Sequence, residues 1–186
     1  MKLTTTTMVT LDGVMQGLGG SDEDRRGGFE RGGWVGPYND EQGMAFLNEV
    51  YGRADTFLLG RRTFEIFAAS WGRWPDPGDS PIWTALNTRP KYVATTTPFD
   101  PEWSDTTVLS GDVAADIREL KGQAGGELEV HGSGVLIRWL LANDLSTRST
   151  CSPSPWSSAR GRGCSLTPAR TSRSSWWDRR PSLPAG

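Results

Sequence analysis

Two short glycine-containing segments are the places in this sequence where backbone and side chains together could bind a phosphate group. The segment GRRT occupies residues 60–63, and the segment GSG occupies residues 132–134. Each follows an apolar run and precedes a helical pattern, so backbone N–H groups and a helix N-terminus would face an anion. The first adds two cations and a hydroxyl, and the second allows close backbone approach. For either segment alone, a plain chain turn with solvated side chains is the favoured interpretation.

Side chains that could move a proton are scarce. Asp12 lies in the triplet LDG at residues 11–13, after the first β-branched run. An Asp-Gly pair is also a common turn signal, so a purely structural role for Asp12 stays open. His131 is the only histidine, and its place beside a glycine-rich turn favours hydrogen bonding to backbone groups over catalysis. Both cysteines, Cys151 and Cys164, lie near the C-terminus, so neither a disulfide framework nor a metal cluster is indicated.

Alternating strand and helix patterns must position these residues. β-branched residues over 2–14 predict a first strand, and a charged, glycine-rich stretch over 16–43 predicts a functional loop or lid. Further strands are expected at residues 56–59, 91–97, 107–109 and 127–130, and helices at 41–51, from Gly60 through Phe67, at 113–121 and at 135–142. Asp40 or Asn39 is expected to cap the first helix, and Asp112 the third. This order predicts an α/β fold with a largely parallel sheet covered on both faces.

Composition divides the chain near Leu145. Residues 1–145 carry 13 Lys+Arg against 21 Asp+Glu, a net charge of −8, which is typical of an acidic domain and gives no support for nucleic-acid binding. Residues 146–186 carry seven Arg, one acid, eleven Ser and five Pro, and they contain no Val, Ile, Phe, Tyr or Met. Such a segment buries too little apolar surface to offset chain entropy, so we expect disorder there. No apolar run reaches the roughly 20 residues of a membrane span, and a cytoplasmic protein is expected.

With a strand over 91–97 between them, the GRRT and GSG segments resemble the cofactor-binding framework of the dihydrofolate reductase-like family. This family includes dihydrofolate reductase and the reductase domain of riboflavin biosynthesis. Many bacterial relatives end their first strand with the LDG triplet found here at residues 11–13. The resemblance covers residues 1–145 and implies an α/β three-layer fold with a mostly parallel central sheet. It also implies NADPH as the cofactor and, since relatives are often dimers, suggests a homodimer.

The resemblance assigns the cofactor to particular residues. Those implied to bind NADPH are Thr10, Gly60, Arg61, Arg62, Thr63, Thr95, Thr96, Gly132, Ser133, Gly134 and Val135. Most would face the phosphates and the adenosine end, and Thr10 would lie beside the nicotinamide. Relatives often carry Arg where Thr96 stands, so the grip on the 2′-phosphate would rest on Arg61 and Arg62.

Substrate and catalytic roles are implied in the same way. Asp12 would lie beside the nicotinamide and the substrate, and Trp34 and Tyr38 would close over them from the lid. Asp40 is the nearest match to the helix carboxylate that holds the pterin in dihydrofolate reductase. The implied reaction moves a hydride from C4 of the nicotinamide to a C=N or C=O carbon of a pteridine- or pyrimidine-like molecule, with a carboxylate or ordered water supplying the proton. A nucleotide-binding module without turnover is the alternative from a different class.

An abrupt change in residue types after Leu145 suggests a shifted reading frame. Relatives continue there with strands that complete the sheet, whereas this chain turns to Ser, Arg, Pro and Trp. Under a one-base shift with GC-rich codons, residues 146–165 become VDEVDLLTFPVVVGAGTRLF and residues 171–177 become DIALELV, which are typical of strands. We therefore expect a single-base deletion near codon 145, missing C-terminal strands and weak stability. A genuine basic disordered tail, or one that binds nucleic acid, is the alternative.

Overall fold

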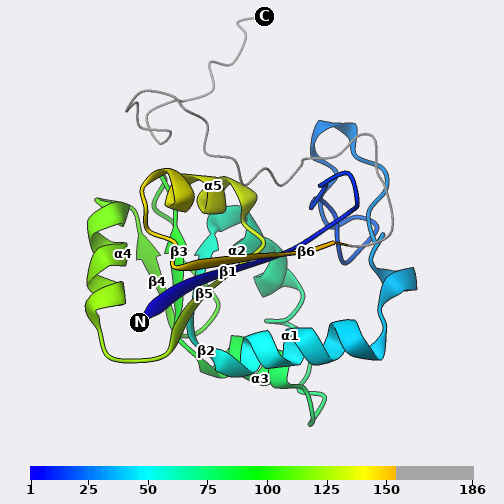
Figure 1. Ribbon diagram of the computed structural model, residues 1–186. Helices are drawn as coiled ribbons and strands as arrows, with labels where there is room; N and C mark the ends of the chain where they lie inside the picture. The colour runs from blue at the N-terminus through cyan, green and yellow to red at the C-terminus, as the bar shows by residue number, and fades with distance from the viewer. Residues whose placement is uncertain (154–186) are drawn as a thin grey trace, which may run out of the picture.

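A six-stranded parallel sheet is the centre of the computed structural model, which describes residues 1–153 (Figure 1). The strands are β1 (Lys2–Val9), β2 (Ala54–Gly60), β3 (Lys91–Ala94), β4 (Thr106–Leu109), β5 (Glu127–His131) and β6 (Arg148–Pro153), and the helices are α1 (Glu41–Arg53), α2 (Arg61–Ala69), α3 (Pro81–Thr88), α4 (Val113–Gly122) and α5 (Gly134–Ala142). The strand order is β4-β3-β2-β5-β1-β6, and every neighbouring pair is parallel. The predicted α/β fold with a mostly parallel central sheet is confirmed. Among the described residues, no helix is long and apolar enough to cross a membrane.

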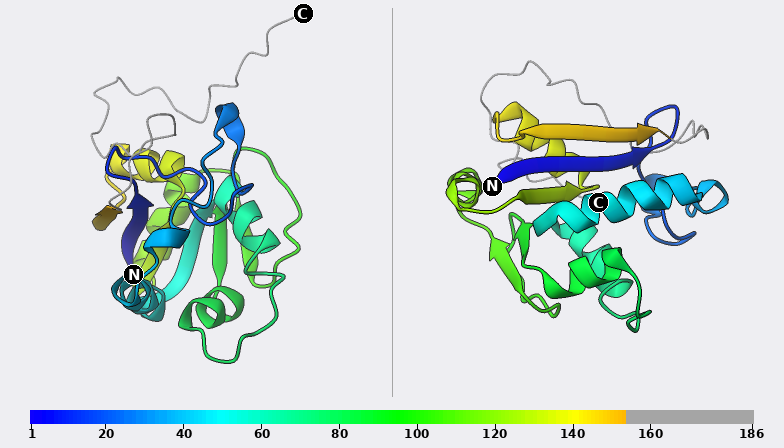
Figure 2. Two further views of the ribbon diagram at one scale, coloured as in Figure 1. Left: turned by 90° about the vertical axis from the view of Figure 1, so that its right-hand side faces the viewer. Right: turned by 60° about the horizontal axis from the view of Figure 1, so that its bottom comes forward.

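Helices cover both faces of the sheet and create two separate cores (Figures 1 and 2). In strand β2, Leu58 belongs to the core formed with α4 and α5, whereas Phe57 and Leu59 belong to the core formed with α1, α2 and α3. Alternate residues of a strand point to opposite faces, and both faces are apolar here because helices cover both. All three side chains are fully buried.

Side-chain caps fix where two of the predicted helices begin. Asp40 accepts a hydrogen bond from the Gly43 N–H at 2.7 Å at the start of α1. Asp112 accepts one from the Ala115 N–H at 3.0 Å at the start of α4. Each carboxylate satisfies a backbone donor that the first helical turn would otherwise leave unpaired. Both caps agree with the sequence prediction.

Helix α3 was not predicted from the sequence. Ser80 caps it by accepting from the Trp83 N–H at 3.2 Å, and Pro81 occupies its first turn, where no N–H is needed. Its Ile82 and Leu86 are buried beside α1. The helix therefore completes one of the two cores.

The first strand is shorter than predicted. It ends at Val9, after which the Thr10 N–H donates to the Val14 carbonyl and the Gly13 N–H donates to the Thr10 carbonyl, both at 2.8 Å. Gly13 has a φ of +83°, a left-handed conformation that side chains disfavour. The Asp-Gly pair thus acts as a tight turn that stops the strand.

The ordered fold extends beyond the boundary that composition predicts at Leu145. Strand β6 pairs with β1 in parallel register along its full length. The Thr147 N–H also donates to the Leu3 carbonyl at 2.8 Å. The expected disorder after Leu145 is therefore wrong for β6, because backbone hydrogen bonds to a buried strand can order a segment whose side chains are polar. Residues 154–186, on which the rest of that prediction falls, lie outside the described residues.

Candidate functional site

A cavity of about 1270 Å³ opens at the carboxyl ends of strands β2, β3 and β5. Helices α2 and α5 begin at its wall, directly after β2 and β5. Ten of the residues that the resemblance implies for the cofactor line it: Gly60, Arg61, Arg62, Thr63, Thr95, Thr96, Gly132, Ser133, Gly134 and Val135. Open parallel α/β sheets bind ligands at this edge. The structure thus brings the GRRT and GSG segments together in one cavity.

One hydrogen bond joins the two segments directly. The Gly60 N–H donates to the Ser133 hydroxyl oxygen at 3.0 Å. Gly132 and Ser133 both have left-handed backbone conformations, with φ of +63° and +51°. A tight turn of this kind exposes successive N–H groups, as anion-binding backbone concavities do. Helix α5 begins at the next residue, and the positive end of its dipole adds to the same potential.

Two glycines of the cavity wall lie close to neighbouring side chains. A Cβ added at Gly134 would overlap the sulfur of Met15, and one added at Gly60 would lie 3.5 Å from the Ser133 hydroxyl. The Gly60 N–H is engaged by Ser133, so the backbone donors that could face an anion are those of the GSG turn and of the first turns of α2 and α5. The residues present therefore fit the phosphates of a dinucleotide cofactor.

Both arginines of the GRRT segment pair with one carboxylate, Glu65, which also lines the cavity. Arg61 Nε lies 2.9 Å from Glu65 Oε1, and Arg62 Nη1 lies 3.7 Å from Glu65 Oε2. Arg61 also donates to the Thr97 carbonyl at 3.3 Å, and its guanidinium carbon lies 4.4 Å from the centroid of the Phe99 ring. Sequence reasoning missed Glu65, although its spacing of four residues from Arg61 is a recognisable helix ion-pair signal.

The loop after β3 forms the wall next to these arginines. The strand ends at Ala94 instead of the predicted residue 97, because Thr95 closes a turn. The Thr95 hydroxyl donates to the Thr97 carbonyl at 3.0 Å and accepts from the Thr97 N–H at 3.1 Å. Thr95 is buried, whereas Thr96 is exposed. The turn therefore leaves Thr96 as the accessible residue at the end of this strand.

His131 lies in an aromatic part of the cavity, between two rings. Its ring centroid is 5.5 Å from that of Tyr51 and 5.9 Å from that of Phe67, and all three residues line the cavity. Its Nδ1 is buried without a hydrogen-bond partner among the described residues, so this nitrogen does not satisfy a backbone group as predicted. Burial lowers the pKa of His131 to about 4, which keeps the imidazole neutral at neutral pH.

A buried carboxyl group, Glu129, lies two residues before His131 on the same face of β5. The Thr4 hydroxyl donates to Glu129 Oε2 at 2.5 Å. Burial raises the pKa of Glu129, and burial together with the charge of Glu129 raises the pKa of Tyr51. Both shifts favour the protonated forms in this part of the molecule. Sequence reasoning missed Glu129, because the alternation of Glu127, Glu129 and His131 with Leu128 and Val130 indicates a strand but does not show that its polar face is buried.

Five residues implied by the resemblance do not line the cavity. They are Thr10, Asp12, Trp34, Tyr38 and Asp40. The Thr10 hydroxyl donates to Asp12 Oδ1 at 2.5 Å, and Asp40 caps helix α1. Trp34 is buried, with its indole N–H donating to a loop carbonyl at 2.9 Å, and Tyr38 is 42% exposed at the end of a short 3₁₀ turn. Catalytic and substrate roles for these residues stay predictions.

The loop over residues 16–38 supplies another wall of the cavity. The Gln16 amide donates to the carbonyls of Asp24 and Arg26 at 3.1 and 2.7 Å, and the Arg26 guanidinium lowers the pKa of Asp24. Glu23 accepts from two backbone N–H groups of the loop at 2.9 and 3.3 Å, while burial raises its pKa. These bonds give the predicted lid a defined internal structure.

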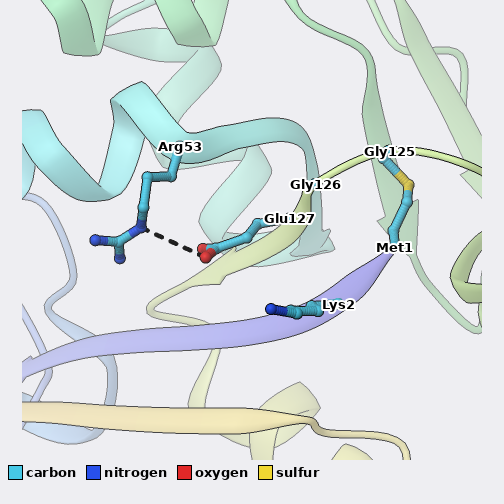
Figure 3. Close-up of a pocket in the computed structure, with 6 residues that line it drawn as sticks. All are labelled: Met1, Lys2, Arg53, Gly125, Gly126 and Glu127. Atoms are coloured by element: carbon cyan, nitrogen blue, oxygen red, sulfur yellow. Dashed lines mark ion pairs between the residues drawn. The ribbon is translucent and has the colours of Figure 1, made fainter.

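A smaller recess lies at the opposite, amino ends of β1 and β5 (Figure 3). Arg53 pairs there with Glu127 at 3.4 Å, as the dashed line in Figure 3 shows. The ammonium group of Met1 donates to two carbonyls near the end of α4, at 2.6 and 2.7 Å. Because protein groups already engage Arg53 and the Met1 ammonium, and Lys2 alone adds a further cation, we assign no ligand to this recess. Within residues 1–153, no three His, Cys, Asp or Glu side chains gather into a metal-binding group.

The parallel sheet, with glycine-containing loops after β2 and β5, has the dihydrofolate reductase-like fold. A sequence profile described as RibD C-terminal domain matches residues 1–152, and the chain belongs to this family. The resemblance inferred from the sequence is confirmed. The match also runs past Leu145, in agreement with the position of β6. No curated protein matches the sequence.

Solved structures support the same fold. The chain resembles a putative riboflavin biosynthesis protein from Shewanella sp. PV-4, with 22% identity, a TM-score of 0.61 and coverage of 88% of this chain and 82% of the other. It also resembles dihydrofolate reductase from Enterococcus faecalis complexed with NADP(H) and RAB-propyl, with 17% identity, a TM-score of 0.54 and coverage of 88% and 76%. At these identities the likeness establishes the fold and not the ligand.

Proposed function

We propose that this protein is an NADPH-dependent reductase of a small heterocycle of the pteridine or pyrimidine type. Family membership and fold support a reductase of the riboflavin-biosynthesis or dihydrofolate reductase kind. The observation that carries the proposal is the hydrogen bond between Gly60 and Ser133, which holds two helix N-termini and two arginines around one cavity. A related structure of the same fold is complexed with NADP(H).

Each part of the cavity has a role in this proposal. NADPH, when bound, supplies a hydride from C4 of its nicotinamide. The GSG backbone would bind the pyrophosphate, and Arg61 and Arg62 would bind the 2′-phosphate. The aromatic part around Tyr51, Phe67 and His131 would exclude water and hold a planar ring.

The source of the proton is a separate question. The two carboxylates that the resemblance implies, Asp12 and Asp40, lie outside the cavity lining. His131 is neutral at neutral pH and is too weakly basic to carry a proton there. We therefore propose that ordered water or a carboxyl group of the cavity wall, such as Glu23, whose pKa is raised by burial, supplies the proton to the reduced substrate.

A titration with NADPH, followed by quenching of tryptophan fluorescence, tests the cofactor assignment. We expect saturable quenching by the wild-type chain, and weaker binding by an Arg61→Gln/Arg62→Gln variant because two phosphate-binding charges are lost. Arg118→Gln is the control, since this arginine is exposed on α4 and does not line the cavity. Oxidation of NADPH in the presence of a pteridine or pyrimidine substrate then tests turnover. Absence of binding by the wild type would overturn the proposal.

We also propose that this copy is impaired by a reading-frame shift near residue 145. In the observed register, Ser149 and Cys151 pair with Thr5 and Thr7, and Arg148 and Thr150 pair with Thr4 and Thr6; all four threonines are buried. The neighbouring frame would place Val and Leu at positions 149 and 151 and acidic residues at positions 148 and 150. That alternation is expected of a strand with one face on a core, whereas the present sequence RSTCSP lacks it. On this proposal, the chain is a nucleotide-binding remnant with reduced or no turnover.

Comparison of this chain with a frame-restored version tests the impairment. We expect the restored chain to unfold at a higher temperature and to bind NADPH more tightly, because apolar residues would replace polar ones in β6 and after it. Equal binding and equal stability would mean that residues 1–153 suffice and that the tail is a dispensable appendage. An intact frame in the genomic DNA, encoding Ser146 onward in close relatives, would also count against the shift.

A further inference from the structure

We infer that Glu65 is a specificity-determining residue that limits the preference of this cavity for NADPH over NADH. The inference rests on the proposed function, because it concerns the same two arginines. Glu65 is not among the residues that the family resemblance implies for the cofactor, but it lines the cavity beside Arg61 and Arg62. Its carboxylate would repel the 2′-phosphate of NADPH and could accept a hydrogen bond from the 2′-hydroxyl of NADH.

The two carboxylate oxygens of Glu65 pair with different arginines. Glu65 Oε1 contacts Arg61 at 2.9 Å, and Oε2 lies 3.7 Å from Arg62. Two positive charges are thus offset by one negative charge at the place where the proposal puts a dianionic phosphate. No third cation compensates at the end of β3, because Thr96 stands there. Arg26 of the loop also interacts electrostatically with Glu65, but it is paired with Asp24, which offsets its charge. The net positive charge that could attract the 2′-phosphate is therefore smaller than the charge of the two arginines alone.

The chemistry of both side-chain types is general for dinucleotide sites. An acidic side chain near the adenosine ribose accepts a hydrogen bond from the 2′-hydroxyl of NADH, whereas arginine accommodates the 2′-phosphate of NADPH. This cavity offers both, so it should accept both cofactors with little discrimination. The effect of one carboxylate should be modest, because the side chains of Arg61, Arg62 and Glu65 are 38%, 46% and 41% exposed and water screens their charges.

Parallel titrations of the full-length chain with NADP⁺ and NAD⁺ test the inference. The quantity of interest is the ratio of the Kd for NAD⁺ to the Kd for NADP⁺. We expect Glu65→Gln to raise this ratio about twofold to fivefold, because it keeps the shape of the side chain and removes the charge. Glu65→Asp should leave the ratio near the wild-type value, because the negative charge is kept.

A matched control exists on helix α1. Glu49 forms the same type of pair with an arginine four residues later, Arg53, and it does not line the cavity. Glu49→Gln should therefore leave the ratio unchanged. A general loss of stability would weaken both nucleotides together and would leave the ratio near its wild-type value.

The outcomes separate the inference from the function on which it rests. If both nucleotides bind and Glu65→Gln leaves their ratio unchanged or lowers it, the role of Glu65 is overturned while the cofactor assignment stands. If the wild type binds neither nucleotide, the proposed function fails and the inference fails with it. As a second readout, the salt dependence of NADP⁺ binding should become steeper in Glu65→Gln, since the net positive charge around the phosphate increases.

Discussion

The backbone N–H of Gly60 donates a hydrogen bond to the hydroxyl of Ser133 across 73 positions of sequence. This contact ties the end of β2 to the start of α5, and both ends belong to the wall of the cavity. The serine hydroxyl thus connects the two glycine-containing segments that the sequence marks separately. Disturbing this bond should affect the cavity more than the rest of the fold.

Replacing Ser133 by Ala should loosen the cavity. The Gly60 N–H would lose its partner, and we expect a loss of about 1 kcal/mol in the free energy of unfolding together with weaker nucleotide binding. Urea unfolding and an NADPH titration measure the two effects. Ser104→Ala is the control, since Ser104 is exposed and does not line the cavity. Unchanged binding in Ser133→Ala would show that the bond does not shape the cavity.

Replacing Gly132 by Ala should destabilise the protein through backbone strain. Gly132 has a φ of +63°, which costs a residue with a Cβ about 1 kcal/mol or more. Space is not the limit, because the nearest side-chain atom to an added Cβ, from Thr63, is 3.8 Å away. Gly52→Ala is a comparison variant with the opposite expected effect. Gly52 lies within α1, and a Cβ added there would meet no atom within 4 Å. Alanine at this position should therefore raise the free energy of unfolding by up to about 1 kcal/mol. Thermal unfolding of the two variants should move in opposite directions.

Acidification should destabilise the protein through His131. Its pKa is lowered to about 4 in the folded state, against 6.5 for the free side chain, so the unfolded chain binds more protons between these values. The free energy of unfolding should therefore fall as pH falls through this window, by at most about 3 kcal/mol. Urea unfolding at neutral pH and at about pH 5 measures the change. In His131→Phe, which keeps a ring between Tyr51 and Phe67, this part of the pH dependence should disappear.

Raising the pH should stabilise the folded protein through Lys91. This lysine is buried, it donates to the carbonyls of Leu86 and Arg89 at 2.9 and 3.0 Å, and burial lowers its pKa to about 8 from 10.5. The folded state then releases the proton first, so the free energy of unfolding should rise between pH 8 and 10.5 relative to Lys91→Met. We expect a difference of up to about 3 kcal/mol across that window. Parallel slopes for the two proteins would contradict the shifted pKa.

Much of the fold could be predicted because local signals agree with the tertiary structure. Asp40 and Asp112 precede amphipathic runs, and each caps the helix that follows. Gly60 ends β2 and Gly132 follows β5, each shortly before a helix begins, so the two loops of the cavity could be recognised from glycines between strand and helix patterns. Helix α3 was missed because its start at Ser80-Pro81 lies in a proline- and tryptophan-rich stretch without clear periodicity.

The site was predicted less completely, because long-range packing decides which residues face the cavity. Trp34, whose contact with a substrate stays a prediction, packs with Val14 and Phe29 in a small core of the loop, and the sequence does not indicate this packing. Tyr51 lies on the buried face of α1, and its packing against His131 at the cavity wall has no local signal in the sequence. Glu129 and His131 share a strand face through the two-residue period, yet only the placement of α1 shows that this face is covered.

The position of β1 has a consequence for protein synthesis. Its described partners are β5 and β6, with Lys2 opposite Glu127, so β1 has no neighbouring strand until β5, far along the chain, has been made. Until then its backbone edges are open to other nascent chains and to chaperones. The last described strand, β6, pairs with the second edge of β1. A mutation or frameshift that weakens β6 would therefore leave this edge exposed for longer and increase the need of the nascent chain for chaperones.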